Sequence, residues 1–239
     1  MEQYELPLVF FTVFAQWGAG GVLALTLCQA FSAQKFSAMQ CRTLALRFWI
    51  ITVLGSCASL AHLGAPEGAY RSLTGLGSSW LSREVAAFIV LNGVMFCWLL
   101  LCWFRPAPRG VTLLGGVTAL VGLGTILVTS QVYYQMPLHP LWHNAATPAA
   151  FLGTALLTGF MSVAIARAYW HLSPSTVCNA GIVTGIVLSA GALGLRYQVP
   201  GADASSPLLW WQLFASVCVA VWGISRLNSG MRSWLWVAL

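Results

Sequence analysis

The stretch SLAHLGAPEGAYRSLTGLGSSWLSREVAAF, residues 59–88, joins the end of one long apolar segment to the start of the next. It also contains His62 and Glu84, two of the very few ionisable residues that border the apolar segments. Ionisable groups at membrane depth are costly to bury, and those that occur are usually functional. Any chemistry in this chain is therefore expected to be centred on this stretch.

The composition of the rest of the chain determines its class. Of its 239 residues, 59% are hydrophobic and only 7% are charged, whereas soluble domains carry roughly 25% charged residues. The mean hydropathy is +0.79, and several apolar runs exceed the roughly 18 residues that indicate a membrane-spanning helix. The sequence therefore predicts an all-α integral membrane protein with a single membrane domain over residues 1–239.

Seven segments are long and apolar enough to be predicted as spans. They cover approximately residues 7–31, 43–63, 84–104, 111–131, 148–169, 176–195 and 208–226. The tail that follows, residues 227–239, is too short to cross a bilayer core of roughly 30 Å. Trp234 and Trp236 favour a position for it at the membrane interface. A bundle of about seven transmembrane helices is expected.

The distribution of basic residues predicts the orientation of this bundle. The N-terminus carries Glu2 and Glu5, and the first basic residue is Lys35, which is unlike a secretory signal. With the N-terminus outside the cytoplasm, only Arg71, Arg83 and Arg196 lie in outer connections. The inner connections and the tail then hold Lys35, Arg42, Arg47, Arg105, Arg109, Arg167, Arg226 and Arg232. This excess follows the positive-inside rule, and it explains the net charge of +6 without a nucleic-acid partner.

Neither a metal centre nor a haem is expected in this chain. The seven cysteines show no Cys-x-x-Cys pair and no metal-ligand spacing, and most lie in apolar segments, where a thiol behaves as a small hydrophobe. His139, His143 and His171 fall in predicted connections. His62 therefore has no intramembrane histidine partner for a bis-histidine haem.

His62 and Glu84 are the candidate catalytic residues. They are predicted at the ends of adjacent helices near the outer interface, where an imidazole and a carboxylate can take protons from a donor that loses them on oxidation. The alternative is structural: Glu84 offsets a helix N-terminus, and His62 caps a helix or pairs locally. Gln16, in the middle of the first span, is placed either to reach a buried ligand or to bond a neighbouring helix.

Small and aromatic residues predict how the bundle packs and what its outer face does. GAGG at 18–21, GG at 115–116, and Gly181 with Gly185 allow helices to approach closely. The outer connections are rich in aromatic residues, including Tyr70, Trp80 and Trp142. They indicate a docking face for a peripheral partner, an aromatic belt at headgroup level, or both.

Three stretches give the chain a resemblance to a known family. They are ELPLVFFTVFAQWGAGG (5–21), HLGAPEGAYRSLTGLGSSWLSREV (62–85), and the arrangement of Pro140, Trp142, Thr147 and Pro148. Together they resemble the DmsC family, the membrane anchor subunits of dimethyl sulfoxide (DMSO) reductase. The likeness covers roughly residues 5–170 and weakens beyond. Members of that family typically have eight spans, so the last would be absent here or reduced to residues 227–239.

The resemblance implies a function and partners. It implies a menaquinol-binding anchor in the bacterial cytoplasmic membrane that oxidises quinol during anaerobic respiration. Electrons would pass to a docked iron–sulfur subunit and then to a molybdopterin catalytic subunit, both on the outer side, in a heterotrimer. In the family, the His of the HLG motif and the Glu at the start of the third helix are tied to quinol binding; they correspond to His62 and Glu84.

Two alternatives are kept open. One is the anchor of a related molybdoenzyme, such as a selenate, tetrathionate or polysulfide reductase, which would share all of these features. The other is a small transporter, which would need a polar path through the bilayer. Apart from His62 and Glu84, the predicted spans contain few ionisable residues that could form such a path.

Overall fold

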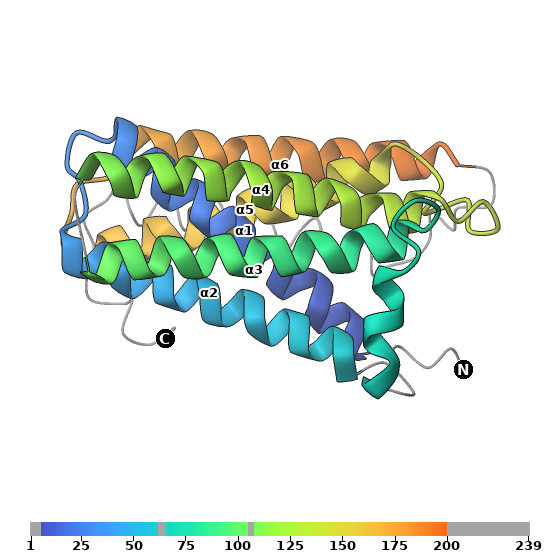
Figure 1. The fold of residues 1–239 in the computed structure, drawn as a ribbon. Coiled ribbons are helices and arrows are strands. Elements are labelled where there is room, and N and C mark those ends of the chain that lie inside the picture. Colours follow the sequence, from blue (N-terminus) through green and yellow to red (C-terminus); the bar gives the residue numbers. More distant parts are fainter. Residues whose placement is uncertain (1–5, 62–65, 105–107, 200–239) are drawn as a thin grey trace.

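Six long helices form an antiparallel bundle in a computed structural model, which describes residues 6–61, 66–104 and 108–199 (Figure 1). A short 3₁₀ helix, η1 (Pro66–Leu73), lies across one end of the bundle, between the second and third long helices. The long helices are α1 (Leu6–Phe31), α2 (Ala38–Ala61), α3 (Trp80–Phe104), α4 (Pro108–Tyr134), α5 (Ala146–Tyr169) and α6 (Thr176–Tyr197).

The all-helical membrane architecture predicted from the sequence is confirmed for the described residues. All six long helices are sufficiently long and apolar to cross a bilayer. They correspond to the first six predicted spans, so six spans are found here where seven to eight were predicted in all. The predicted seventh span, 208–226, and the tail that follows it lie outside the described residues.

The start of α3 corrects one predicted boundary that matters for the site. The helix begins at Trp80, whereas the sequence placed its start at Glu84. Ser79 caps it: its carbonyl accepts the Arg83 N–H at 3.2 Å, and its hydroxyl accepts the Ser82 N–H at 3.4 Å, as an N-cap serine does. Glu84 therefore lies in the second turn, further inside the bundle than predicted.

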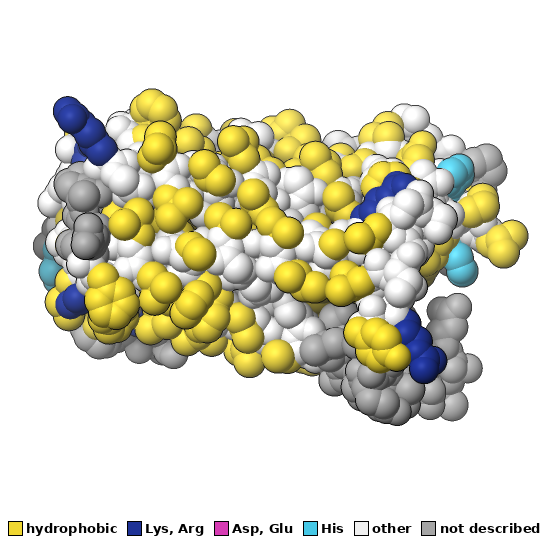
Figure 2. All heavy atoms as spheres, in the orientation of Figure 1, with side chains coloured by type: hydrophobic (Ala, Val, Ile, Leu, Met, Phe, Trp, Pro, Cys, Tyr) yellow, Lys and Arg dark blue, Asp and Glu magenta, His cyan; other side chains and the backbone are white. Residues whose placement is uncertain are grey.

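α1 is the central helix. It packs against α2, α4, α5 and α6, and a larger share of it is buried than of any other span in the described residues. Val22, Leu25 and Cys28 on this helix are fully buried. The face shown in Figure 2 is mostly hydrophobic along the length of the bundle, with Lys and Arg near its two ends. Such a surface suits lipid around the middle and water at the ends.

The predicted small-residue contacts are largely present. Gly20 of α1 lies against the Ala155 backbone of α5, and Gly159 of α5 lies against the Gly20 backbone, so the two helices meet backbone to backbone. Gly18 and Gly21 face α2, where both lie against Phe48. Gly181 and Gly185 of α6 pack on α5. In the GG pair of α4, Gly115 packs on neighbouring side chains, whereas Gly116 faces open space.

Arg167 joins two connections at the end of the bundle opposite η1. It is 2% exposed and donates from Nη1 to the Gln34 carbonyl at 2.9 Å. It also donates from Nε and Nη2 to the Ser173 carbonyl, at 3.0 and 2.7 Å. The Gln34 side chain in turn accepts the Ser173 N–H at 2.7 Å. The α1–α2 and α5–α6 connections are thereby held together by a guanidinium bound to carbonyl groups.

Replacing Arg167 by Met is expected to destabilise the protein by about 3 kcal/mol, because it removes the three hydrogen bonds that the buried guanidinium donates to the Gln34 and Ser173 carbonyls. A thermal melt in mild detergent should show this as a midpoint about 5–10 °C lower. Arg167→Lys, which restores the charge but not the forked geometry, should recover part of the loss. Arg47→Met is the control, since Arg47 is exposed on α2. A melt of Arg167→Met that matches the control would show that the guanidinium does not hold these connections.

Candidate functional site

Glu84 lines a cavity between α1, α2, η1 and α3. The cavity has a volume of about 490 Å³, within the range of about 300–1,000 Å³ that is usual for small-molecule sites. Its apolar wall is formed by Phe11, Leu73, Val85, Phe88 and Ile89, and its polar groups belong to Ser56, Ser59, Tyr70, Glu84 and Asn92. The cavity therefore suits a molecule that is mostly apolar and carries a few polar groups.

The Glu84 carboxyl group is buried without the partners it would normally require. The residue is 5% exposed, and its Oε1 atom has no hydrogen-bond partner. Thr129 of α4 lies close to the carboxyl group, but its hydroxyl is also without a hydrogen bond. A buried polar atom that lacks a partner is costly, so Oε1 keeps an unused capacity to accept a hydrogen bond.

Asn92 presents a second buried acceptor on the same face of α3. Its Nδ2 donates to the Ser56 hydroxyl at 3.0 Å and to the Phe88 carbonyl at 2.9 Å. These bonds fix the amide so that Oδ1 is left, buried, without a donor. Asn92 comes two helical turns after Glu84, about 12 Å along the helix. Two residues that line one cavity therefore each hold a buried acceptor atom without a donor.

Asn92 was missed in the sequence analysis, although its position contained a signal. It is an isolated amide within the apolar run of α3, and an amide in a membrane span requires partners. The spacing from Glu84 through Phe88 to Asn92 is i, i+4, i+8, which places all three on one face of a helix. This spacing would have connected the amide to the carboxyl group.

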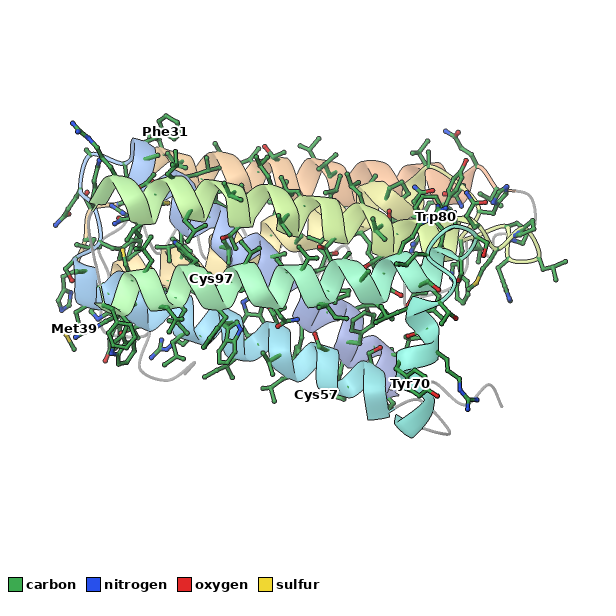
Figure 3. The ribbon with its side chains drawn as sticks, in the orientation of Figure 1. Phe31, Met39, Cys57, Tyr70, Trp80 and Cys97 are labelled. Carbon is green, nitrogen blue, oxygen red and sulfur yellow. The ribbon has the colours of Figure 1, made fainter. Side chains whose placement is uncertain are left out.

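Two aromatic rings from different helices form part of the apolar wall of the cavity. The rings of Phe11 in α1 and Phe88 in α3 lie 4.9 Å apart, tilted by 60°. η1 closes one end and contributes Tyr70, which is 65% exposed and lies at the same end of the bundle as Trp80 (Figure 3). Aromatic walls favour a flat ring system as the ligand.

The other two predicted site residues are not placed in this cavity. His62 lies outside the described residues; it follows Ala61, the last residue of α2, and Ser59 from the final turn of α2 lines the cavity. Gln16 is buried in α1 but is not among the lining residues. It comes five residues after Phe11, a rotation of about 140° around the helix, which points it to another face.

The connection between α4 and α5 is an ordered aromatic loop at the same end of the bundle. Trp142 packs edge-on against Tyr133, and His139 lies against Trp142. The buried Thr147 hydroxyl donates to the Trp142 carbonyl at 2.8 Å. Leu138 at the tip is 90% exposed. A fixed loop with an apolar tip is typical of a surface that contacts another protein.

In the described part of the chain, no group of three His, Cys, Asp or Glu side chains is arranged to hold a metal ion. What this arrangement can do is bind a flat, largely apolar molecule and accept its hydrogen-bond donors at Glu84 and Asn92. A carboxylate that accepts such a hydrogen bond can also take the proton.

Comparisons with known proteins identify several relatives of the chain. A family model described as "DMSO reductase anchor subunit (DmsC)" matches residues 1–194. The chain is 32% identical over 239 residues to the C polypeptide of the anaerobic dimethyl sulfoxide reductase of Escherichia coli K12, in an alignment that covers 92% of this chain and 82% of the relative. It is 36% identical over 159 residues to the protein of the same description from Haemophilus influenzae, covering 65% of this chain and 56% of the relative.

A third relative has a different description. The C polypeptide of the sulfite dehydrogenase of Allochromatium vinosum is 30% identical over 177 residues, which cover 68% of this chain and 54% of the relative. No solved structure matches the chain.

Proposed function

Because the chain belongs to the DMSO reductase anchor subunit family, we propose that it binds menaquinol in the cavity beside Glu84 and oxidises it. The electrons pass to a docked iron–sulfur subunit and from there to a molybdopterin catalytic subunit. The observation that carries this proposal is that two residues lining one cavity, Glu84 and Asn92, each hold a buried acceptor, Oε1 and Oδ1, without a hydrogen-bond partner.

The two acceptors suit the two hydroxyl groups of a quinol. A quinol carries its hydroxyls at opposite ends of a flat ring, and each can donate one hydrogen bond of about 2.8 Å. The ring with both hydrogen bonds spans a length similar to the separation of Glu84 and Asn92 along α3. Phe11 and Phe88 supply the apolar surface that the ring system contacts.

Oxidation of the quinol releases two electrons and two protons and leaves the quinone. In the proposed mechanism Glu84 takes one proton at its carboxylate, and the second, released by the hydroxyl beside Asn92, passes through water in the cavity to His62, the residue after the end of α2. Both protons then leave to water at this end of the bundle. The electrons go directly to a cluster of the iron–sulfur subunit, so this chain needs no haem of its own.

The partner is proposed to dock at the same end, on the aromatic loop and η1. Support comes from the exposed apolar side chains gathered there: Leu138 is 90% exposed, Tyr70 65% and Leu76 46%. With the N-terminus outside, as the basic residues indicate, this end faces outward from a bacterial cytoplasmic membrane. Protons would then be released on the side where the catalytic subunit sits.

The A. vinosum relative favours a second candidate, the anchor of a related oxidoreductase whose electrons run the other way. A dehydrogenase donates electrons to the membrane, so the same cavity would bind quinone and Glu84 would return a proton to it. Family membership speaks against the transporter alternative, for which the described helices supply one buried carboxyl group at one end.

The proposed function is tested by purifying the tagged protein from its native membranes in mild detergent. We expect co-purified iron in severalfold excess over molybdenum, together with DMSO reduction that depends on added menaquinol. A preparation that contains both metals and reduces quinone with sulfite as the electron donor would establish the second candidate function instead. A preparation that contains neither metal would contradict the proposal.

A further inference from the structure

A second cavity lies at the other end of the bundle from Glu84. It has a volume of about 830 Å³ and is bounded by the end of α1, the start of α2, the end of α3 and the start of α4. Cys102 of α3 lines it, 18 residues or about 27 Å along the helix from Glu84. In Figure 3, the labels Phe31 and Met39 mark this end of the bundle. The two cavities are therefore separate.

Two cations line the mouth of this second cavity, and none of the acidic side chains that the structure describes lies beside them. Lys35 and Arg109 both line it and both are exposed. Glu84 is the one acidic residue among those whose side chains the structure describes, and it lies at the far end of α3. The described part of the chain therefore leaves two positive charges at this mouth unneutralised.

The inner part of the cavity is apolar. Phe36, Cys102 and Val111 line it and are each less than 9% exposed. Leu113, on α4, also lines it and is 76% exposed, so on this side the cavity opens toward the hydrophobic surface of the bundle. A cationic mouth beside an apolar wall open to lipid matches a phosphate headgroup with acyl chains attached.

The mouth is fixed in place by hydrogen bonds. Gln29, in α1, accepts the Phe36 N–H at 2.7 Å and donates to the Phe36 carbonyl at 3.2 Å. Phe36 follows Lys35 directly, so the backbone beside the lysine is held by the end of α1. The Ser37 hydroxyl and the Gln40 side chain cap the start of α2 reciprocally. Little ordering is then needed when a ligand binds.

We propose that this cavity binds an anionic phospholipid, with its phosphate between Lys35 and Arg109 and an acyl chain along Val111 and Leu113. Basic pockets between transmembrane helices are a known means of binding anionic headgroups. A free phosphate would make no use of the apolar wall. A quinol would find no carboxylate among the lining residues to take its proton.

The test measures thermal stability in the purified complex. The tagged protein, with whatever subunits co-purify, is stripped of lipid by detergent washing. It is then melted with phosphatidylglycerol vesicles, with phosphatidylcholine vesicles, or with inorganic phosphate alone. A ligand that binds only the folded state raises the melting midpoint. We expect phosphatidylglycerol to raise it, and phosphatidylcholine and phosphate to leave it unchanged.

Substitutions of the two cations test whether the lipid stabilises the protein by binding in this second cavity. In the double variant Lys35→Gln/Arg109→Gln, affinity for phosphatidylglycerol, taken from the rise in melting midpoint with lipid concentration, should fall roughly 25-fold, because each cation near an anionic headgroup contributes roughly fivefold. The matched control is Arg42→Gln/Arg47→Gln, which removes the same charge at the same end from residues outside the cavity lining. The two single variants at Lys35 and Arg109 should each lose about fivefold.

The proposal is overturned if the double variant and the control retain the same affinity, or if phosphatidylcholine stabilises the complex equally. A rise with inorganic phosphate alone would overturn it in favour of a soluble anion. Should the double variant fail to purify, the single variants decide the question, since each removes one exposed side chain.

Discussion

Replacing Glu84 by Gln is expected to lower quinol-dependent turnover of the assembled complex by at least about a hundredfold. A positioned general base contributes about 10²- to 10⁴-fold to a proton transfer, and glutamine keeps the size of the side chain without its ability to accept the proton. The measurement is the steady-state rate with a menaquinol analogue as donor. The rate with an artificial donor that reduces the iron–sulfur subunit directly should stay at the wild-type value.

Asn92→Leu separates binding from proton transfer at the same cavity. Leucine has a similar size but no acceptor, so the quinol hydroxyl opposite it loses one hydrogen bond. That loss raises KM about tenfold, with a smaller effect on kcat. Thr184→Val serves as the control, because this exposed α6 hydroxyl bonds only to its own helix, at Ala180. Wild-type quinol turnover in Glu84→Gln would remove Glu84 from the mechanism, whatever Asn92→Leu does.

Replacing Gly159 by Ala is expected to abolish accumulation of folded protein. The added methyl group would meet the Gly20 carbonyl carbon and oxygen and the Gly21 nitrogen, which are backbone atoms that cannot rotate away. Overpacking of an interior commonly costs about 1–3 kcal/mol, and a clash between two helix backbones belongs at or above the top of that range. The measurement is the yield of monodisperse protein in mild detergent.

Two other glycines make the Gly159 experiment a graded series. A methyl group at Gly124 of α4 would have no neighbouring atom within 4 Å, so Gly124→Ala should be tolerated and should gain slightly from the higher helix propensity of alanine. Gly181 faces the Phe160 ring, a side chain that can shift, so Gly181→Ala should be intermediate. Equal yields for Gly159→Ala and Gly124→Ala would show that α1 and α5 are not in backbone contact.

The sequence predicted the helices well because length and hydropathy suffice for that purpose. It predicted the start of α3 less well, since Trp80 and Leu81 extend the helix behind the Ser79 cap, while Glu84 was the first residue of the expected span. The central position of α1 was not predicted. A helix that is apolar on all sides gives no indication of which faces contact protein and which contact lipid.

The sequence singled out one residue of the candidate cavity, Glu84, whose functional role stays a prediction. Glu84 stood out because it is a carboxylate beside an apolar run, and the structure gives it a cavity. Asn92 and the cavity could not be derived from composition, since both depend on how α1, α2 and η1 meet α3. The role of His62 stays a prediction, because that residue lies outside the described part of the chain, and so does a ligand-binding role for Gln16.

The central position of α1 has a consequence for how the protein is made. α1 (Leu6–Phe31) leaves the ribosome before α5, the helix whose backbone it touches, which ends at Tyr169. At about 5–20 residues per second, roughly 7–28 s pass between the end of α1 and the end of that partner. Throughout that interval the small residues of α1 and its buried Gln16 and Thr26 lack their final neighbours. Biogenesis therefore includes a waiting period, and an insertion factor that shields this helix would act then.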